Sequence, residues 1–204
     1  MASAASRSSA GLLAFVLAGA AACHAGNTSK LQAYTHCDGF ARGVRGVTLD
    51  RHPQTAEPWR EVGFAGKSRR VSVIDGYRVT YSYPRTFAFA SLRAEQSDPA
   101  RYAEDRRIVS ANFAEMAQAD QALDLAEFSH RGLQVQTLTK RRLGGRTLAM
   151  TQILADLDAV IVTIFFLNHA PEHRHFQTME EFIGLRDAFI RGYIECVATK
   201  RAAS

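Results

Sequence analysis

Alternating apolar and polar positions dominate the middle of the chain. RRVSVI (69–74) and YRVTYSY (77–83) alternate with a period of two, which is typical of half-buried β-strands. They flank Asp75-Gly76, a pair in which both residues accept positive φ, so the pattern predicts a β-hairpin at this point. The segment TFAFASLRA (86–94) predicts a third strand.

A second group of strands is predicted further along the chain. LQVQTLTKRRL (133–143) and RTLAMTQILADL (146–157) flank Gly144-Gly145, which predicts another hairpin. AVIVTIFFL (159–167) follows as an unbroken apolar run, too short to be a membrane span. Such a run favours a strand that is covered on both of its faces.

Two segments repeat their apolar residues at helical spacing. Asp98-Pro99 predicts the start of the first helix, with Asp98 as the cap and Pro99 at the first helical position. Thr178 and Glu181 have the spacing of a capping box, which predicts the start of a closing helix. The expected buried face of the first helix comprises Tyr102, Val109, Phe113 and Met116. That of the closing helix comprises Met179, Phe182, Ile183, Phe189, Ile190, Tyr193 and Ile194. The pattern as a whole predicts an α+β fold, with an antiparallel sheet packed by two helices as an α/β/α sandwich.

The N-terminus has the pattern of an export signal. Arg7 precedes AGLLAFVLAGAAA (10–22), an apolar run of 13 residues. A bilayer span needs about 20 apolar residues, whereas a signal peptide needs fewer. About 180 residues would remain after cleavage, a length and an apolar content (47%) that suit one domain without a transmembrane span. The expected organisation is a signal peptide (1–22), a tether (23–36) and a single domain (37–204), the last divided into an irregular extension with one short strand (37–68) and a core (69–196).

Cys23 stands at the end of the apolar run, and two interpretations of it remain open. Cleavage just before Cys23, after Ala20-Ala21-Ala22, would allow lipid attachment to the cysteine and anchor the protein to a membrane surface. The same Ala-x-Ala pattern also suits ordinary secretion, as does cleavage after Ala25. The chain is therefore expected to be exported, either periplasmic or held at the membrane by lipid.

The other two cysteines, Cys37 and Cys196, lie near the two ends of the expected mature chain. An exported protein meets an oxidising compartment, in which disulfides persist. With Cys23 lipidated or removed, an even pair remains, so we predict a Cys37–Cys196 disulfide. The alternative is a pair of buried free thiols.

The order of these elements resembles the PsbP-like fold. The resemblance covers residues 70–196: YRVTYSYP (77–84), the helix after Asp98, the strands through VIVTIFFL (160–167), and the closing helix that contains YIEC (193–196). This group includes the photosystem II extrinsic protein and bacterial DcrB-type envelope lipoproteins. The resemblance implies an α/β/α sandwich that serves as a binding or accessory module, usually without catalysis.

A histidine-rich loop, NHAPEHRHF (168–176), follows the most apolar predicted strand. It contains His169, Glu172, His173 and His175, which could converge on zinc or copper, since neutral imidazole is a common metal ligand. The alternative is a solvated connection in which the histidines help to cap the next helix.

Positive charge is concentrated at the predicted Gly-Gly hairpin. The chain carries a net charge of +5, and KRRLGGR places Lys140, Arg141, Arg142 and Arg146 at one tip. This tip could contact anionic lipid or an acidic envelope protein, or it could simply be solvated. Nucleic acid is disfavoured as a partner because no aromatic platform flanks these residues.

Residues of the types that hydrolases use occur without a hydrolase motif. Ser129-His130 and Asp156 with Asp158 supply a hydroxyl, an imidazole and carboxylates, but no sharp nucleophile turn is present, and both aspartates suit a turn. The expected function is therefore that of an exported envelope binding or accessory protein without catalytic activity. The alternative is a small metal-dependent or hydrolytic envelope enzyme centred on the 169–175 loop.

Overall fold

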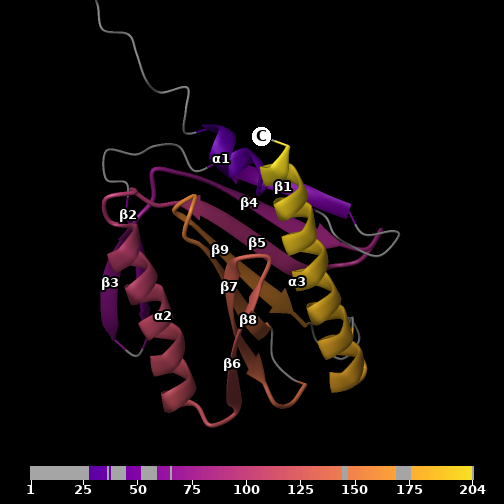
Figure 1. The fold of residues 1–204 in the computed structure, drawn as a ribbon. Coiled ribbons are helices and arrows are strands. Elements are labelled where there is room, and N and C mark those ends of the chain that lie inside the picture. Colours follow the sequence, from indigo (N-terminus) through magenta and orange to yellow (C-terminus); the bar gives the residue numbers. More distant parts are fainter. Residues whose placement is uncertain are drawn as a thin grey trace, which may run out of the picture.

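The chain folds around a seven-stranded antiparallel sheet with the strand order β1-β4-β5-β9-β8-β7-β6 (Figure 1). The computed structural model describes residues 28–35, 37, 45–51, 59–64, 66–143, 147–168 and 176–203. The large sheet contains β1 (Arg45–Arg51), β4 (Asp75–Ser82), β5 (Ala88–Gln96), β6 (Leu123–His130), β7 (Leu133–Lys140), β8 (Thr147–Ala155) and β9 (Val160–Leu167). A separate antiparallel pair contains β2 (Trp59–Phe64) and β3 (Lys67–Ser72). The helices are α1 (Thr28–Gln32), α2 (Tyr102–Ala119) and α3 (Met179–Ala202).

The two long helices cover opposite faces of the large sheet. Successive residues of a strand point to opposite faces. Ile153 belongs to the apolar cluster that contains Phe189 of α3, whereas its neighbour Leu154 belongs to the cluster that contains Val109 of α2. The β2–β3 pair contributes Val71 to the α2 side. The predicted α+β architecture, an antiparallel sheet between two helical layers, is therefore confirmed.

The most apolar predicted strand is the central strand β9. Five consecutive residues, Val160 to Ile164, are buried, because β9 has a strand on each side and a helical layer over each face. On the α3 side, Phe166 packs edge-on against Phe182 and Phe189. Aromatic pairs at such distances add to the stabilisation that area burial alone provides.

The hairpin predicted at Asp75-Gly76 is wrong. β3 pairs only with β2, through a tight turn at Gly66 (φ 81°), and β4 pairs with β1 and β5. Between Ser72 and Asp75 the chain passes from the α2 layer into the large sheet. Pairing across the sheet therefore decides the conformation here, and the Asp75 carboxylate merely accepts a hydrogen bond from the Gly76 N–H (2.8 Å).

The starts of α2 and α3 differ in how well they agree with the starts predicted from the sequence. α2 begins at Tyr102, three residues after the expected position, because Asp98 caps a preceding turn by accepting from the Ala100 N–H (2.9 Å). In α3 the predicted cap is present, although the second bond of the capping box goes to Gln177, one residue before Thr178. The Thr178 hydroxyl accepts from the Glu181 N–H (3.1 Å), while the Glu181 carboxylate accepts from the Gln177 N–H (2.8 Å).

Residues 28–35, which were expected to form part of a tether, instead pack onto the domain. Leu31 and Tyr34 are 2% and 0% exposed. The Tyr34 hydroxyl donates to Asp158 (2.5 Å), and the Tyr34 carbonyl accepts from the Tyr193 hydroxyl (2.9 Å). The segment 37–68, expected to be irregular apart from one short strand at 44–49, contains β1 at that place and also β2. No helix in the described ranges is long and apolar enough to cross a membrane.

Candidate functional site

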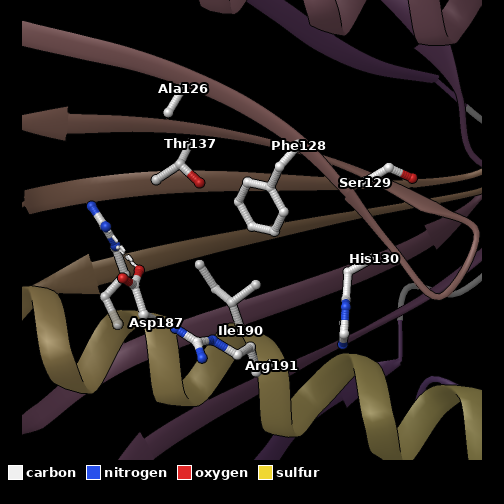
Figure 2. Close-up of a pocket in the computed structure, with 9 residues that line it drawn as sticks. Ala126, Phe128, Ser129, His130, Thr137, Asp187, Ile190 and Arg191 are labelled. Atoms are coloured by element: carbon white, nitrogen blue, oxygen red, sulfur yellow. Dashed lines mark hydrogen bonds and ion pairs between the residues drawn. The ribbon is translucent and has the colours of Figure 1, made fainter.

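A groove lies between the edge strand β6, its neighbour β7 and helix α3 (Figure 2). It has a volume of about 530 Å³, within the range of roughly 300–1,000 Å³ that is typical of ligand sites. β6 is the last strand of the sheet and has β7 as its only neighbour, so no further strand of the sheet closes the groove beyond β6. The groove is lined by Ala126, Phe128, Ser129, His130, Thr137, Arg186, Asp187, Ile190 and Arg191.

The centre of the groove is apolar. Figure 2 shows Phe128 of β6 and Ile190 of α3 facing each other. Ile190 is buried, but Phe128 remains 45% exposed, which is unusual for a large aromatic side chain that faces a helix. Thr137, 3% exposed, lies beside them, and its hydroxyl has no hydrogen-bond partner within the described part of the chain. The groove therefore offers an apolar surface with one unused polar group beside it.

One end of the groove is closed by a cluster around Glu195 of α3. The Glu195 carboxylate lies 2.9 Å from Nε2 of His130 and accepts from Nε of Arg131 at 3.1 and 3.2 Å. Hydrogen bonds from Arg131 and then from His130 hold the pKa of Glu195 below its usual range. These contacts join the β6–β7 hairpin to α3.

Ser129 does not complete a hydrolytic arrangement with His130. The two side chains lie on opposite sides of the strand, and Figure 2 shows the Ser129 side chain directed away from that of His130. The Ser129 hydroxyl donates to the Leu133 carbonyl (3.3 Å), while Nε2 of His130 is occupied by Glu195. Ser129 and His130 therefore make separate structural contacts and do not form a nucleophile with its base.

The arginines of the groove differ in their partners. Arg186 donates to the Thr139 hydroxyl (2.6 Å) and pairs with Asp187 (2.8 Å). Arg191 is exposed and has no ion-pair partner among the residues that the structure describes. An uncompensated cation in the same groove as the exposed ring of Phe128 favours a ligand that has both an apolar and an acidic group.

A second, smaller hollow of about 250 Å³ lies on the α2 side of the sheet. Its lining is mainly apolar, with Asp120 and Lys140 among the polar members. The apolar lining residues are Met116, Leu123, Leu138, Leu148, Ala149, Met150 and Phe165.

The structure forms the expected disulfide between Cys37 and Cys196, whose Cα atoms are 5.5 Å apart. The bond joins the segment after α1 to α3, so both ends of the domain are fixed together. Asp156 and Asp158 lie in the β8–β9 turn, as predicted, where they accept hydrogen bonds from Tyr102 (3.0 Å) and Tyr34 (2.5 Å).

The predicted basic cluster is described only in part. Arg141 pairs with Asp124 of β6 (2.6 Å), whereas Lys140 and Arg142 have no ion-pair partner among the described residues. Arg146 lies outside the described residues, as do Cys23 and all four residues of the histidine loop: His169, Glu172, His173 and His175. Within the described ranges no group of His, Cys, Asp and Glu side chains could hold a metal ion.

Neither β6 nor the groove beside it was predicted from the sequence. LDLAEFSH (123–130) alternates only weakly, but Arg131-Gly132 behind it has the glycine that a tight hairpin needs, and both residues have positive φ (51° and 74°). That pair was the available signal. No local sequence signal pointed to Arg191, because its place in the groove depends on β6, which lies some sixty positions earlier in the chain.

No protein-family model, no curated protein and no solved structure matches this chain. The resemblance to the PsbP-like fold therefore stays a prediction from the order of the elements.

Proposed function

We propose that this protein is an exported binding or accessory protein of the cell envelope, that it acts without catalysis, and that the groove between β6 and α3 is its binding site. The observation that carries the proposal is that one groove contains both the exposed Phe128 ring and Arg191, a cation that the described residues leave unpaired. Phenylalanine and arginine are both enriched at protein interfaces relative to the rest of the surface.

The other polar groups of the groove support a binding role over a catalytic one. His130 and Glu195 pair with each other, as do Arg186 and Asp187, and both pairs join α3 to a strand or stay within α3. Their contacts give the groove fixed walls. A preformed site whose apolar centre is flanked by fixed polar groups can bind and orient a ligand.

Export is supported by the apolar run at 10–22 and by the disulfide, since disulfides persist in oxidising compartments. We expect intact-mass measurement of the mature protein to show a chain that begins at Cys23 with three acyl chains, or at a residue from 23 to 26 without them. A mature chain that still begins at Met1 would contradict export.

Site-specific photo-crosslinking in the native envelope tests the binding site. A photoreactive residue at position 128 should give a discrete adduct that is lost when Arg191→Glu is added. The matched control is the same residue at position 157, because Leu157 is 82% exposed and lies in the β8–β9 turn outside the groove. The proposal fails if position 128 gives no adduct, or if both positions give the same adducts.

A further inference from the structure

The outer edge of β6 is open within the part of the chain that the structure describes. β6 pairs with β7 on one side, and the strand order ends there. Ala126, Glu127, Phe128 and Ser129 are all exposed, so both faces of this stretch are accessible as well as its edge.

The register shows which backbone groups point outward. The N–H of Arg141 donates to the carbonyl of Ala122 (2.9 Å), so the even-numbered residues of β6 direct their backbone groups toward β7. The backbone N–H and C=O groups of Leu125, Glu127 and Ser129 consequently face away from the sheet. No described residue forms a hydrogen bond with them.

This edge carries the acidic residues Asp124 and Glu127 but lacks the other features with which proteins usually protect an edge strand. β6 pairs with β7 over eight residues without a register shift, and it contains no proline and no lysine. The opposite edge strand, β1, has a register shift between Thr48 and Asp50. An exposed, regular edge is a template for another strand.

We propose that β6 binds an extended segment of a partner polypeptide as an additional strand of the sheet. This inference rests on the proposed function and identifies the ligand class of the groove. Backbone hydrogen bonds to Leu125, Glu127 and Ser129 supply affinity, and side chains on alternate positions of the segment supply specificity.

The side chains of the groove define which segment fits. Alternate residues of the added strand point to the α3 side, where Phe128 and Arg191 line the groove. An apolar residue therefore packs against the Phe128 ring, and an acidic residue two positions away pairs with Arg191. The recognised pattern is apolar–any–acidic in extended conformation.

A second copy of this chain fits less well than a foreign segment. If two β6 strands pair so that all three outward-facing residues are used, Leu125 lies opposite Ser129 and Glu127 lies opposite its own copy. Like charges directly opposite each other on adjacent strands are destabilising.

The test uses a proline substitution with a matched control. Glu127→Pro removes the outward N–H of residue 127 without touching the β6–β7 ladder. Glu127→Ala keeps that N–H. Both variants lose the contact between the Glu127 carboxylate and Nε2 of Gln136 (2.8 Å) equally, so the comparison isolates the backbone donor.

The probe is a labelled, acetylated and amidated peptide of about nine alternating threonine and valine residues, with leucine and glutamate placed two positions apart at its centre. We expect the full mature protein to bind it and Glu127→Ala to bind it equally. Glu127→Pro should bind about tenfold more weakly. In amide hydrogen exchange, the peptide should slow Leu125, Glu127 and Ser129 but not Ala126.

A charge exchange tests the side-chain part of the recognition. Arg191→Glu should weaken binding of the glutamate peptide and restore binding of the same peptide with lysine in its place. Strand addition is overturned if the wild type does not bind the peptide or if the proline and alanine variants bind alike. A β6-dependent dimer of the protein in sedimentation would instead make a second copy the occupant of this edge and contradict a foreign segment. If position 128 gives a crosslink but both Glu127 variants bind the peptide equally, the groove remains the proposed binding site and only the strand-addition proposal is rejected.

Discussion

Asp158 shows how a single turn residue holds distant parts of this chain together. It lies between β8 and β9, accepts from the Tyr34 hydroxyl (2.5 Å) and pairs with Arg201 near the end of α3 (2.9 Å). The sequence placed it correctly in a turn, because turn preference is local. Its two partners lie 124 and 43 positions away, and no local pattern specifies them.

Buried tyrosines at the same place predict how stability depends on alkaline pH. Burial, and for Tyr34 also the hydrogen bond to Asp158, raises the pKa of Tyr34 and Tyr193 above the usual tyrosine range, and burial raises that of Tyr77. The native state therefore favours neutral phenols. Tyrosine in the unfolded chain ionises at about pH 10. The contribution of the buried tyrosines to the free energy of unfolding is therefore fully present below about pH 10 and is lost as the pH rises further.

In an alkaline titration, we expect tyrosinate absorbance to rise together with the loss of near-ultraviolet circular dichroism. In the Tyr34→Phe variant, the ionisation of Tyr77 and Tyr193 should still coincide with the loss of near-ultraviolet circular dichroism. Gradual ionisation of most tyrosines while the fold persists would contradict the burial that the structure shows.

At the scale of elements, the sequence predicted best what is decided within a few residues. The α3 start was found because Thr178 and Glu181 are both partners of one local motif. The Asp75-Gly76 hairpin was wrong because a change of layer competes with turn preference there. β6 was missed because an exposed edge strand lacks the strong alternation that burial of one face imposes.

The α3 cap can be tested by two substitutions at one position. Thr178→Ala should lower the free energy of unfolding by about 1 kcal/mol, since it leaves the Glu181 N–H without its acceptor. Thr178→Ser keeps the hydroxyl and should cost little. Denaturant unfolding followed by far-ultraviolet circular dichroism measures both, and equal effects of the two variants would exclude the cap as their cause.

The basic β7–β8 tip is a separate element-scale proposal. If it contacts anionic membrane surfaces, Arg142→Glu should reduce co-sedimentation with anionic vesicles at low salt without changing the melting temperature. Arg141→Glu is a less clean variant, because it also replaces the ion pair with Asp124 by two neighbouring carboxylates. Failure of the unlipidated wild type to co-sediment at low salt would reject this contact.

At the scale of the whole molecule, the disulfide fixes the N-terminal segment against α3. Cys37 and Cys196 are 159 positions apart, and in the chain-entropy model a loop of this length corresponds to about 4–5 kcal/mol, an upper value because disulfides often contribute less than this model gives. The sequence predicted this bond from the number and location of its cysteines alone. The packing of Leu31 and Tyr34 that accompanies it was not predicted, since a short polar stretch before them suggested a tether.

Cys37→Ser and Cys196→Ser should destabilise the protein by similar amounts, and the double variant by little more. One bond is lost in all three cases, so the effects should not add. Chemical denaturation of the oxidised proteins gives the comparison. Additive losses, or two titratable thiols in the native protein, would show that the bond is absent in solution.

The same bond determines how the molecule carries mechanical load. Tension applied between the two ends of the chain enters at Cys37 and leaves at Cys196, so the covalent link bears it and residues 38–195 remain outside the force path. The sheet cannot be unzipped from its termini while the bond is intact. Force applied at β6 by a bound partner instead acts within this closed loop and is resisted by the hydrogen bonds between β6 and β7. Reduction of a single bond would therefore change the protein from one that resists stretching at its ends to one that unravels from them.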